Sequence, residues 1–358
     1  MFLFLQPTLA QVIKKSLNSS DEIVWQVKPQ ADLEGVKGEH ISTSEFEMED
    51  CVQGVVPGII FTAYVESGKE QDPNYADNIY KVDETFYNRP FWYRTKFELP
   101  KSYSKGQRVW LCFDNTNRFA TFYFNGIKIS GSQTSTKDVS GHMLRSKFDV
   151  TELLNRNGEN VVAVLIADAD QKKTRTAKDP YGIACSPSYL AGAGWDWMPY
   201  VPGRLAGITG NVYLAITGDV VMVDPWVRSD LPSLQRAKLS ISTNLKNTSD
   251  SPIDVTLSGI IKPGNIRFSK TIQLAADTIE NISFSASEFK QLVVDTPKLW
   301  WPNGYGEPNL YNCELTCKID GKVSDKQNIT FGIRKYDYRM VDNSVGYPVM
   351  HFYINGQR

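Results

Sequence analysis

The sequence predicts an all-β protein, and three observations lead to that fold class. Short apolar runs that alternate or are rich in β-branched and aromatic residues dominate the chain, whereas helical periodicity is scarce. Turn-forming residues separate these runs about every 8–12 residues, a spacing typical of sandwiches and jelly rolls. Aromatic residues make up 12% of the sequence, and they favour strands. We therefore expect two successive β domains.

The first domain, residues 21–218, is predicted to be a jelly roll or related sandwich. Asn125-Gly126 lies between two short apolar runs, and this pair readily supplies the two positive-φ positions of a type I′ hairpin turn. The segment KFDVTELL is expected to end in a short helical turn. The other predicted strands are FWYRTKFELP (91–100), RVWLCFDN (108–115), ENVVAVLIAD (159–168) and GNVYLAIT (210–217).

The second domain, residues 219–335, is predicted to be an immunoglobulin-like sandwich. Its strands follow one another with polar turns between them, and their number, roughly seven over about 100 residues, matches that fold. They are AKLSISTNLKN, DVTLSGIIK, FSKTIQLA, NISFSAS, LYNCELTCKIDG and QNITFGIRKYDYRM. The tail, residues 336–358, contains the hairpin signal Asn355-Gly356 and is interpreted as the lead-in to a further domain.

Composition excludes several function classes. The formal net charge is −1, which gives no electrostatic reason to expect nucleic acid as a partner. No apolar run is long enough to span a membrane. The five cysteines are scattered and form neither a disulfide framework nor a metal-ligand cluster, so we expect free thiols and no metal. No dinucleotide or phosphate-binding motif is present, so no cofactor is expected.

The N-terminal segment MFLFLQPTLAQ, within residues 1–20, is apolar and ends in a cleavage-like PTLA. We interpret it as the remnant of a signal peptide, which predicts a periplasmic or extracellular (secreted) protein. The alternative is a native apolar start that packs as an edge strand.

The segment SPSYLAGAGWDWMPYVPGR (186–204) is the most informative part of the chain. Trp195 and Trp197 flank Asp196 in a run too rich in Gly and Pro to form a helix or a long strand. Aromatic rings stack on the C–H face of a sugar, and a carboxylate accepts hydrogen bonds from its hydroxyls. This pattern predicts a carbohydrate site. The alternative is that Asp196 caps a turn while the two tryptophans fill a seam between domains.

Catalytic groups are not visible in the sequence. The three histidines have no partner constellation, and no GxSxG nucleophile motif occurs. Hydrolysis of a glycosidic bond needs two carboxyl groups held at a fixed separation, and no two carboxylates here can be placed that way.

Several segments together resemble glycoside hydrolase family 2, in the branch of β-mannosidases, endo-β-mannosidases and exo-β-glucosaminidases. They are VPGIIFTAYVESG, DPNYADN, FWYRTKFELP, ATFYFNGIKI, the GWDW segment, PKLWWPNGYGEPNLYNCEL, FGIRKYDYRM and HFYINGQR. The combination of GWDW with LWWPNGYGEPNLY is the most specific. The continuation GITGNVYL departs from the usual family pattern.

The resemblance implies a jelly-roll sugar-binding domain, then an immunoglobulin-like sandwich, and then a (β/α)8 barrel that would carry both catalytic glutamates. We therefore expect this chain to be truncated before the barrel, to lack catalytic residues and to be inactive alone. By position in the family, Asp196, Trp195 and Trp197 would form a wall of the sugar site, and Asn78 would lie near its mouth. The alternatives are a stand-alone lectin-like module and a purely structural cell-surface protein.

Overall fold

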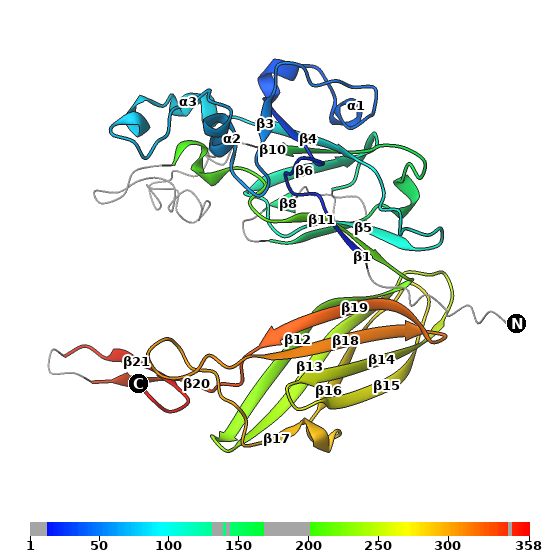
Figure 1. Cartoon of the computed structure of the whole chain (residues 1–358), viewed down its shortest axis with the longest axis vertical. Helices are drawn as coiled ribbons and strands as arrows, with labels where there is room; N and C mark the ends of the chain where they lie inside the picture. The colour runs from blue at the N-terminus through cyan, green and yellow to red at the C-terminus, as the bar shows by residue number, and fades with distance from the viewer. Residues whose placement is uncertain (1–12, 131–138, 141–143, 168–200, 343–345) are drawn as a thin grey trace, which may run out of the picture. The chain divides into compact units, whose positions relative to one another are not determined.

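The computed structural model describes residues 13–130, 139–140, 144–167, 201–342 and 346–358. These residues separate into two compact units, Ile13–Ile216 and Thr217–Arg358, each of which is described by itself (Figure 1). Both units are built from antiparallel β-sheets, so the predicted all-β class is confirmed.

The first unit contains two sheets, with strand orders β1-β11-β5-β9 and β3-β2-β4-β10-β6-β7; β8 pairs with β6. Its strands are β1 (Ile13–Ser16), β2 (Trp25–Pro29), β3 (Val52–Gly54), β4 (Phe91–Phe97), β5 (Arg108–Phe113), β6 (Phe119–Phe124), β7 (Ile127–Lys128), β8 (Val139–Ser140), β9 (Ser146–Asp149), β10 (Asn160–Ile166) and β11 (Val212–Thr217). Side chains from both sheets form one buried apolar core, as in a sandwich.

Short helices lie in the connections of this unit. They are η1 (Gln30–Leu33), α1 (Gly38–Ile41), α2 (Ile60–Glu66), η2 (Asn78–Lys81), α3 (Glu84–Tyr87), η3 (Thr151–Leu153) and η6 (Pro202–Leu205). The helical turn predicted after KFDV is η3 and is confirmed. The helices between β3 and β4 were not predicted.

Strands β4 and β10 are buried on both faces. The sequence of β10 is accordingly a nearly continuous apolar run, whereas β4 also contains the buried polar residues Arg94 and Thr95. Tyr93 and Val164 face the sandwich core, whereas Trp92 and Ala163 belong to a smaller cluster with Ile41 on the other face. The segment around α1 therefore covers the outside of this sheet.

The predicted hairpin at Asn125-Gly126 is confirmed. Asn125 has φ 46° and Gly126 has φ 84°, the two left-handed positions that a type I′ turn requires. Phe124 of β6 pairs with Ile127 of β7 across this turn.

The second unit contains one sheet of order β12-β13-β16, with β17 pairing β13, a second sheet of order β15-β14-β18-β19, and a two-stranded ribbon of β20 and β21. Its elements are β12 (Val220–Ser233), β13 (Arg236–Asn247), β14 (Ile253–Lys262), β15 (Ile266–Leu274), β16 (Ile279–Ser285), η7 (Lys290–Leu292), β17 (Val293–Asp295), β18 (Tyr311–Ile319), β19 (Lys322–Phe331), β20 (Tyr336–Val341) and β21 (Val349–Ile354). Both four-stranded sheets contribute to one apolar core, so the predicted sandwich is confirmed.

Three details differ from the predicted strands, and one is that the short strand β17 was not predicted. Strand β12 was not predicted, and its register shifts between Val223 and Trp226, where Asp224 has φ 49° and breaks the alternation. The run QNITFGIRKYDYRM is two strands rather than one. It divides because buried Ile333 forms a parallel bridge with Leu299 between β19 and β20.

The described cysteines, Cys51, Cys112, Cys313 and Cys317, are free, as predicted. Cys313 and Cys317 lie on the buried face of β18 and are fully buried. Cys185 lies outside the described residues.

Candidate functional site

The candidate sugar-binding segment, residues 186–204, belongs to the connection that follows β10 in the sequence. We refer to residues 168–200 of this connection, which lie outside the described residues, as segment 168–200. Trp195, Asp196 and Trp197 lie outside the described residues, whereas the residues on both sides of segment 168–200 are described. Ile166, the last residue of β10, pairs with Phe91 of β4 and with Ala120 of β6. The segment therefore leaves one defined end of the larger sheet.

Ala206 and Gly207, which follow η6, are held by backbone hydrogen bonds to other parts of the unit. The amide of Ile60 donates to the carbonyl of Ala206 at 2.9 Å, and the amides of Asn117 and Gly207 each donate to the other's carbonyl at 2.8 Å. A Cβ atom at Gly207 would lie 2.5 Å from the carbonyl oxygen of Gly58. Only glycine allows this close approach of two backbones.

The inserted helices between β3 and β4 lie at the same sheet end, because α2 and α3 both contact η6 and β4 begins there. Their aromatic side chains pack edge to face. Tyr64 contacts Phe86, Tyr87 and Phe91, with ring centroids 5.1 Å, 5.5 Å and 6.1 Å away, and Phe61 contacts Tyr87 at 5.1 Å. This cluster gives the end of the sheet a rigid apolar base.

Tyr87 is the polar link in this cluster. Its hydroxyl donates to Oε1 of Glu70 at 2.7 Å, and its side chain is almost fully buried. Burial, followed by the bond to Glu70, raises the pKa of Tyr87 well above its usual value. Burial also raises the pKa of Tyr64 to about 12. Both phenols therefore stay protonated at neutral pH, which suits a structural role rather than proton transfer.

Asn78, the fourth predicted site residue, opens η2 in the same insertion. Its Nδ2 donates to the carbonyl of Asp72 at 3.0 Å, and its Oδ1 accepts from Nζ of Lys81 at 3.3 Å. The side chain is half-buried and holds the turn from Asp72 to η2 together. Its amide is thus engaged within its own loop.

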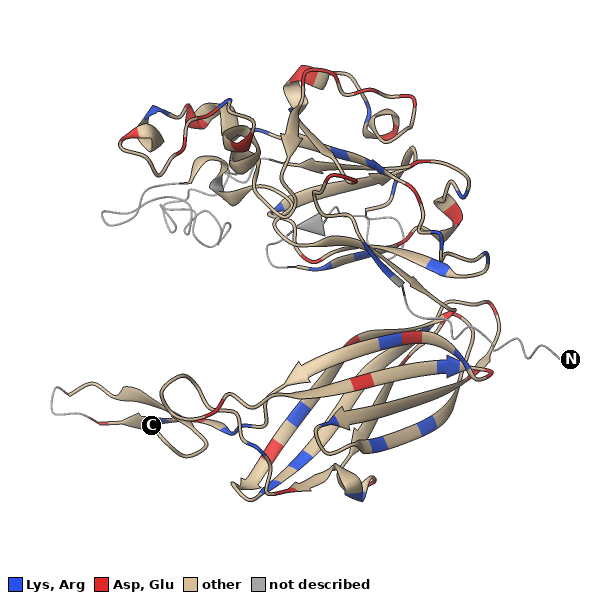
Figure 2. Cartoon of the chain, in the orientation of Figure 1, with Lys and Arg blue, Asp and Glu red and all other residues tan. Residues whose placement is uncertain are grey.

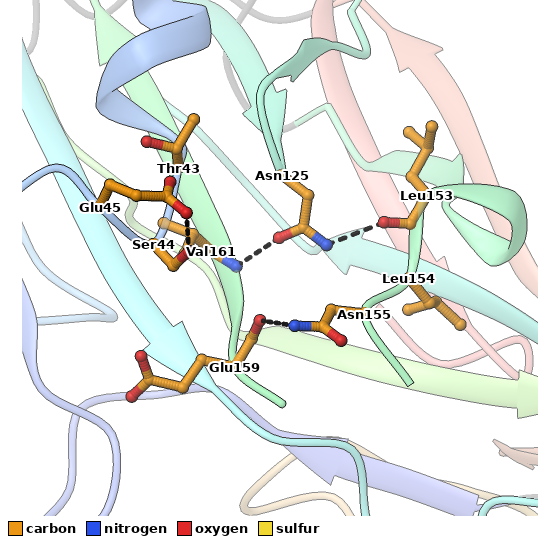
Figure 3. A pocket seen from close by; sticks show the side chains of 9 residues that line it. All are labelled: Thr43, Ser44, Glu45, Asn125, Leu153, Leu154, Asn155, Glu159 and Val161. Atoms are coloured by element: carbon orange, nitrogen blue, oxygen red, sulfur yellow. Dashed lines mark hydrogen bonds between the residues drawn. The ribbon is translucent and has the colours of Figure 1, made fainter. Parts of the chain in front are cut away.

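A separate pocket of about 320 Å³ lies around the opposite end of β10 (Figure 3). Asn125 Oδ1 accepts from the amide of Val161 at 2.7 Å, while its Nδ2 donates to the carbonyl of Leu153 at 2.8 Å. Asn155 Nδ2 donates to the carbonyl of Glu159 at 3.2 Å. The seven residues of β10 separate this pocket from the other end of the strand, at Ile166, by roughly 20 Å.

The aromatic cluster of α2 and α3 at this end of the sheet was missed in the sequence. A signal for it existed, because Ile60, Phe61, Ala63 and Tyr64 are all buried and recur at helical spacing within α2. In the part of the chain that the structure describes, no group of three His, Cys, Asp or Glu side chains is arranged to hold a metal ion. Across the same residues, no helix is long and apolar enough to cross a membrane.

Comparison with family models matches each unit separately. Residues 25–210 match the "Glycosyl hydrolase 2 galactose-binding domain-like" model, and residues 220–334 match "Glycosyl hydrolases family 2".

Curated relatives cover most of the chain. It is 31% identical over 302 residues to the exo-β-D-glucosaminidase of Streptomyces avermitilis, covering 84% of this chain and 30% of that protein. It is 29% identical over 327 residues to the mannosylglycoprotein endo-β-mannosidase of Lilium longiflorum, covering 86% and 32%. It is 28% identical over 295 residues to β-mannosidase B of Aspergillus terreus, covering 78% and 32%.

Solved structures share the fold. The exo-chitosanase of Amycolatopsis orientalis superposes with a TM-score of 0.77 at 23% identity, covering 96% of this chain and 36% of that one. A β-glucuronidase of Bacteroides uniformis superposes with a TM-score of 0.66 at 19% identity, covering 97% and 34%. The chain thus spans about a third of the length of these proteins. It belongs to glycosyl hydrolase family 2 and carries the galactose-binding-like and sandwich domains of that family.

Proposed function

We propose that this chain is the N-terminal, non-catalytic part of a retaining glycosidase that hydrolyses β-mannosides or related β-glycosides. The observation that carries the proposal is that both units match family 2 models. The chain also aligns with about a third of the length of relatives that are a β-mannosidase and an exo-β-glucosaminidase. A retaining mechanism uses a nucleophilic carboxylate and an acid/base carboxyl. By family resemblance, both belong to a barrel that follows the residues of this chain.

Within that enzyme, we assign Trp195, Asp196 and Trp197 to one wall of the sugar pocket, with Asn78 near its mouth. The chain is held on both sides of segment 168–200, by the strand pairing of Ile166 before it and by the backbone hydrogen bonds of Ala206 and Gly207 after it. This supports the role, because residues that contact substrate have to be held in place. In this role Asp196 accepts hydrogen bonds from sugar hydroxyls, and the two indoles shape the apolar side of the pocket.

The wall is tested in the complete gene product by Asp196→Asn, with Asn78→Ala as a second variant. Loss of a charged hydrogen-bond acceptor is expected to lower kcat/KM for a nitrophenyl β-mannoside or β-glucosaminide by about tenfold or more. Asp72→Asn serves as the control. Asp72 lies in the same loop as Asn78 but bonds Asn78 only through its backbone carbonyl, which this substitution leaves in place. Unchanged kcat/KM in Asp196→Asn would remove this residue from the site.

Binding by the 358-residue chain alone separates this proposal from a lectin. A wall without the rest of its pocket should bind mannose or glucosamine oligosaccharides too weakly to detect by calorimetry at millimolar sugar. Millimolar or tighter binding by the chain alone would favour a stand-alone carbohydrate-binding protein.

We also propose that the protein is secreted to the periplasm or the cell exterior, on the basis of the apolar segment MFLFLQPTLAQ. Fractionation of the source cells tests this, and recovery of the protein only in the cytoplasmic fraction would contradict it.

A further inference from the structure

The chain between α2 and α3 exposes two tyrosine side chains to solvent. Tyr75 is 73% exposed and Tyr80 is 76% exposed, whereas no other large hydrophobic side chain in the described part of the first unit exceeds 50%. The neighbouring Tyr64 and Tyr87 are buried in the aromatic cluster. The same insertion therefore packs some of its aromatic rings and leaves two of them available for contact with a ligand.

Hydrogen bonds give the loop that carries these two rings a fixed backbone. The amide of Asn78 donates to the carbonyl of Tyr75 at 3.2 Å, and the amide of Tyr80 donates to the carbonyl of Asp77 at 3.0 Å. The Asn78 side chain adds its bond to the carbonyl of Asp72. Because the backbone is already ordered, a ligand that binds the rings pays little for ordering the loop.

The charged groups of this loop are engaged within it. Nζ of Lys81 lies 2.8 Å from Oδ1 of Asp77, and Oδ1 of Asp72 accepts from the amide of Asn74 at 2.9 Å. Figure 2 shows residues of both signs in the insertion that contains α3. The groups that the loop presents outward are thus two phenol rings, which suit an uncharged ligand with apolar C–H faces and hydroxyl groups, such as a pyranose.

The loop adjoins the predicted carbohydrate segment through described residues. Helix η2, which contains Tyr80, is followed within three residues by α3, and α3 contacts η6. Helix η6 includes residues 202–204, the last residues of segment 186–204. A Cβ atom at Gly203 would lie 3.2 Å from the carbonyl oxygen of Tyr87, so the two backbones meet closely. The exposed tyrosines and the predicted sugar site therefore belong to the same end of the unit.

We propose that Tyr75 and Tyr80 bind the sugars of an oligosaccharide that extend beyond the unit held at the proposed wall, and so favour longer substrates; this inference rests on the proposed function. Each ring stacks on the C–H face of a sugar, and its hydroxyl bonds to sugar hydroxyls or water. Contacts with parts of the substrate distant from the cleaved bond raise kcat/KM for substrates that possess those parts.

The complete gene product tests this preference with substrates of two lengths. The wild type and the double variant Tyr75→Ala with Tyr80→Ala are compared on mannotriose and nitrophenyl β-mannoside, and on the glucosamine trisaccharide and nitrophenyl β-glucosaminide. The ratio of kcat/KM for the trisaccharide to that for the nitrophenyl glycoside should fall about fivefold or more in the variant. An unchanged ratio overturns the inference.

Two further variants separate stacking from other effects. Tyr75→Phe with Tyr80→Phe keeps both rings and should retain most of the wild-type ratio, whereas a loss as large as that of the alanine variant would contradict stacking. Tyr347→Ala removes a tyrosine that is 75% exposed in the second unit, and it should leave the ratio unchanged. A fall as large in Tyr347→Ala would show that the effect is not specific to the loop.

The same kinetics distinguish failure of this inference from failure of the proposed function. Equal loss of kcat/KM on both substrate lengths in the alanine variant would assign the two tyrosines to the structure of the loop and overturn the inference alone. Absence of turnover of every substrate by the wild-type complete product would defeat the proposed function, and this inference with it.

Discussion

At the scale of single residues, two buried polar side chains organise loops that the sequence pattern alone would leave undetermined. Arg94 lies in the middle of β4. The sequence pattern predicts a strand here but does not predict which groups the Arg94 side chain bonds. The structure shows it 1% exposed and bonded to four oxygens, of which three are backbone carbonyls in the segment from Ile41 to Phe46. Arg94 thus ties the α1 segment to the outer face of the sheet.

Arg94→Lys is expected to destabilise the first unit by about 2–4 kcal/mol, because one ammonium cannot reach the oxygens that the planar guanidinium bridges. Arg236→Lys is the control, since the Arg236–Asp295 pair is exposed and should contribute little. Urea unfolding followed by tryptophan fluorescence measures both. An Arg94→Lys chain as stable as the Arg236→Lys chain would contradict the bridging role.

Asn355 offers a second test, because its backbone and its side chain make separate contributions. Its φ of 51° favours glycine, so Asn355→Gly keeps the turn and removes only the side-chain bonds to Trp300 and Lys335. We expect a loss of about 2 kcal/mol in the second unit. Asn265→Gly, at φ 52° in an exposed turn, should change stability by far less. Equal effects in urea unfolding would mean that the buried bonds are unimportant.

At the scale of elements, the strands with clear alternation or clear turn chemistry were predictable, and the exceptions have physical causes. The Asn125-Gly126 turn specifies its own conformation, so its hairpin could be found from two residues. Strand β12 could not, because the bulge at Asp224 interrupts its alternation. The division between β19 and β20 depends on a long-range bridge from Ile333 to Leu299, which no local pattern contains.

The return from segment 168–200 depends on the backbone contact at Gly207. Gly207→Ala should destabilise the first unit by about 2 kcal/mol or more, because the methyl group meets the Gly58 carbonyl. At Gly158, a Cβ would first meet the end of the Asn155 side chain, which can move, so Gly158→Ala is the control. Thermal unfolding compares them, and a harmless Gly207→Ala would show that this contact is not tight.

The buried thiols of β18 predict a dependence of stability on pH. Burial raises the pKa of Cys313 and that of Cys317 to about 12, from 9.0. A raised pKa means that the folded chain holds these protons longer than the unfolded chain does. Their contribution to stability is therefore complete below pH 9 and is lost as pH rises from 9 towards 12, at up to about 1.4 kcal/mol per pH unit for each thiol.

Comparison with a variant isolates this effect from other groups that titrate above pH 9. The double change Cys313→Ala with Cys317→Ala should flatten the fall in unfolding free energy between pH 9 and 10.5, measured by urea unfolding. A parallel fall in both proteins would contradict the assignment.

At the scale of the whole molecule, the two sandwiches could be predicted from the sequence, which also predicts a carbohydrate site in residues 186–204. Family order implied the domain succession, and independent strand patterns agreed with it. The aromatic cluster around Tyr64 and Tyr87 was missed, because helices α2 and α3 are short and lie between strands that dominate the sequence pattern. Trp195, Asp196 and Trp197 remain predictions.

We propose that this chain supplies part of a glycosidase and none of its catalytic carboxyls. The direct measurement is hydrolysis of nitrophenyl β-mannoside and β-glucosaminide by the purified 358-residue chain, beside the complete gene product. We expect no turnover above buffer for the chain, and turnover with retained anomeric configuration for the complete product. Hydrolysis by the 358-residue chain alone would contradict it.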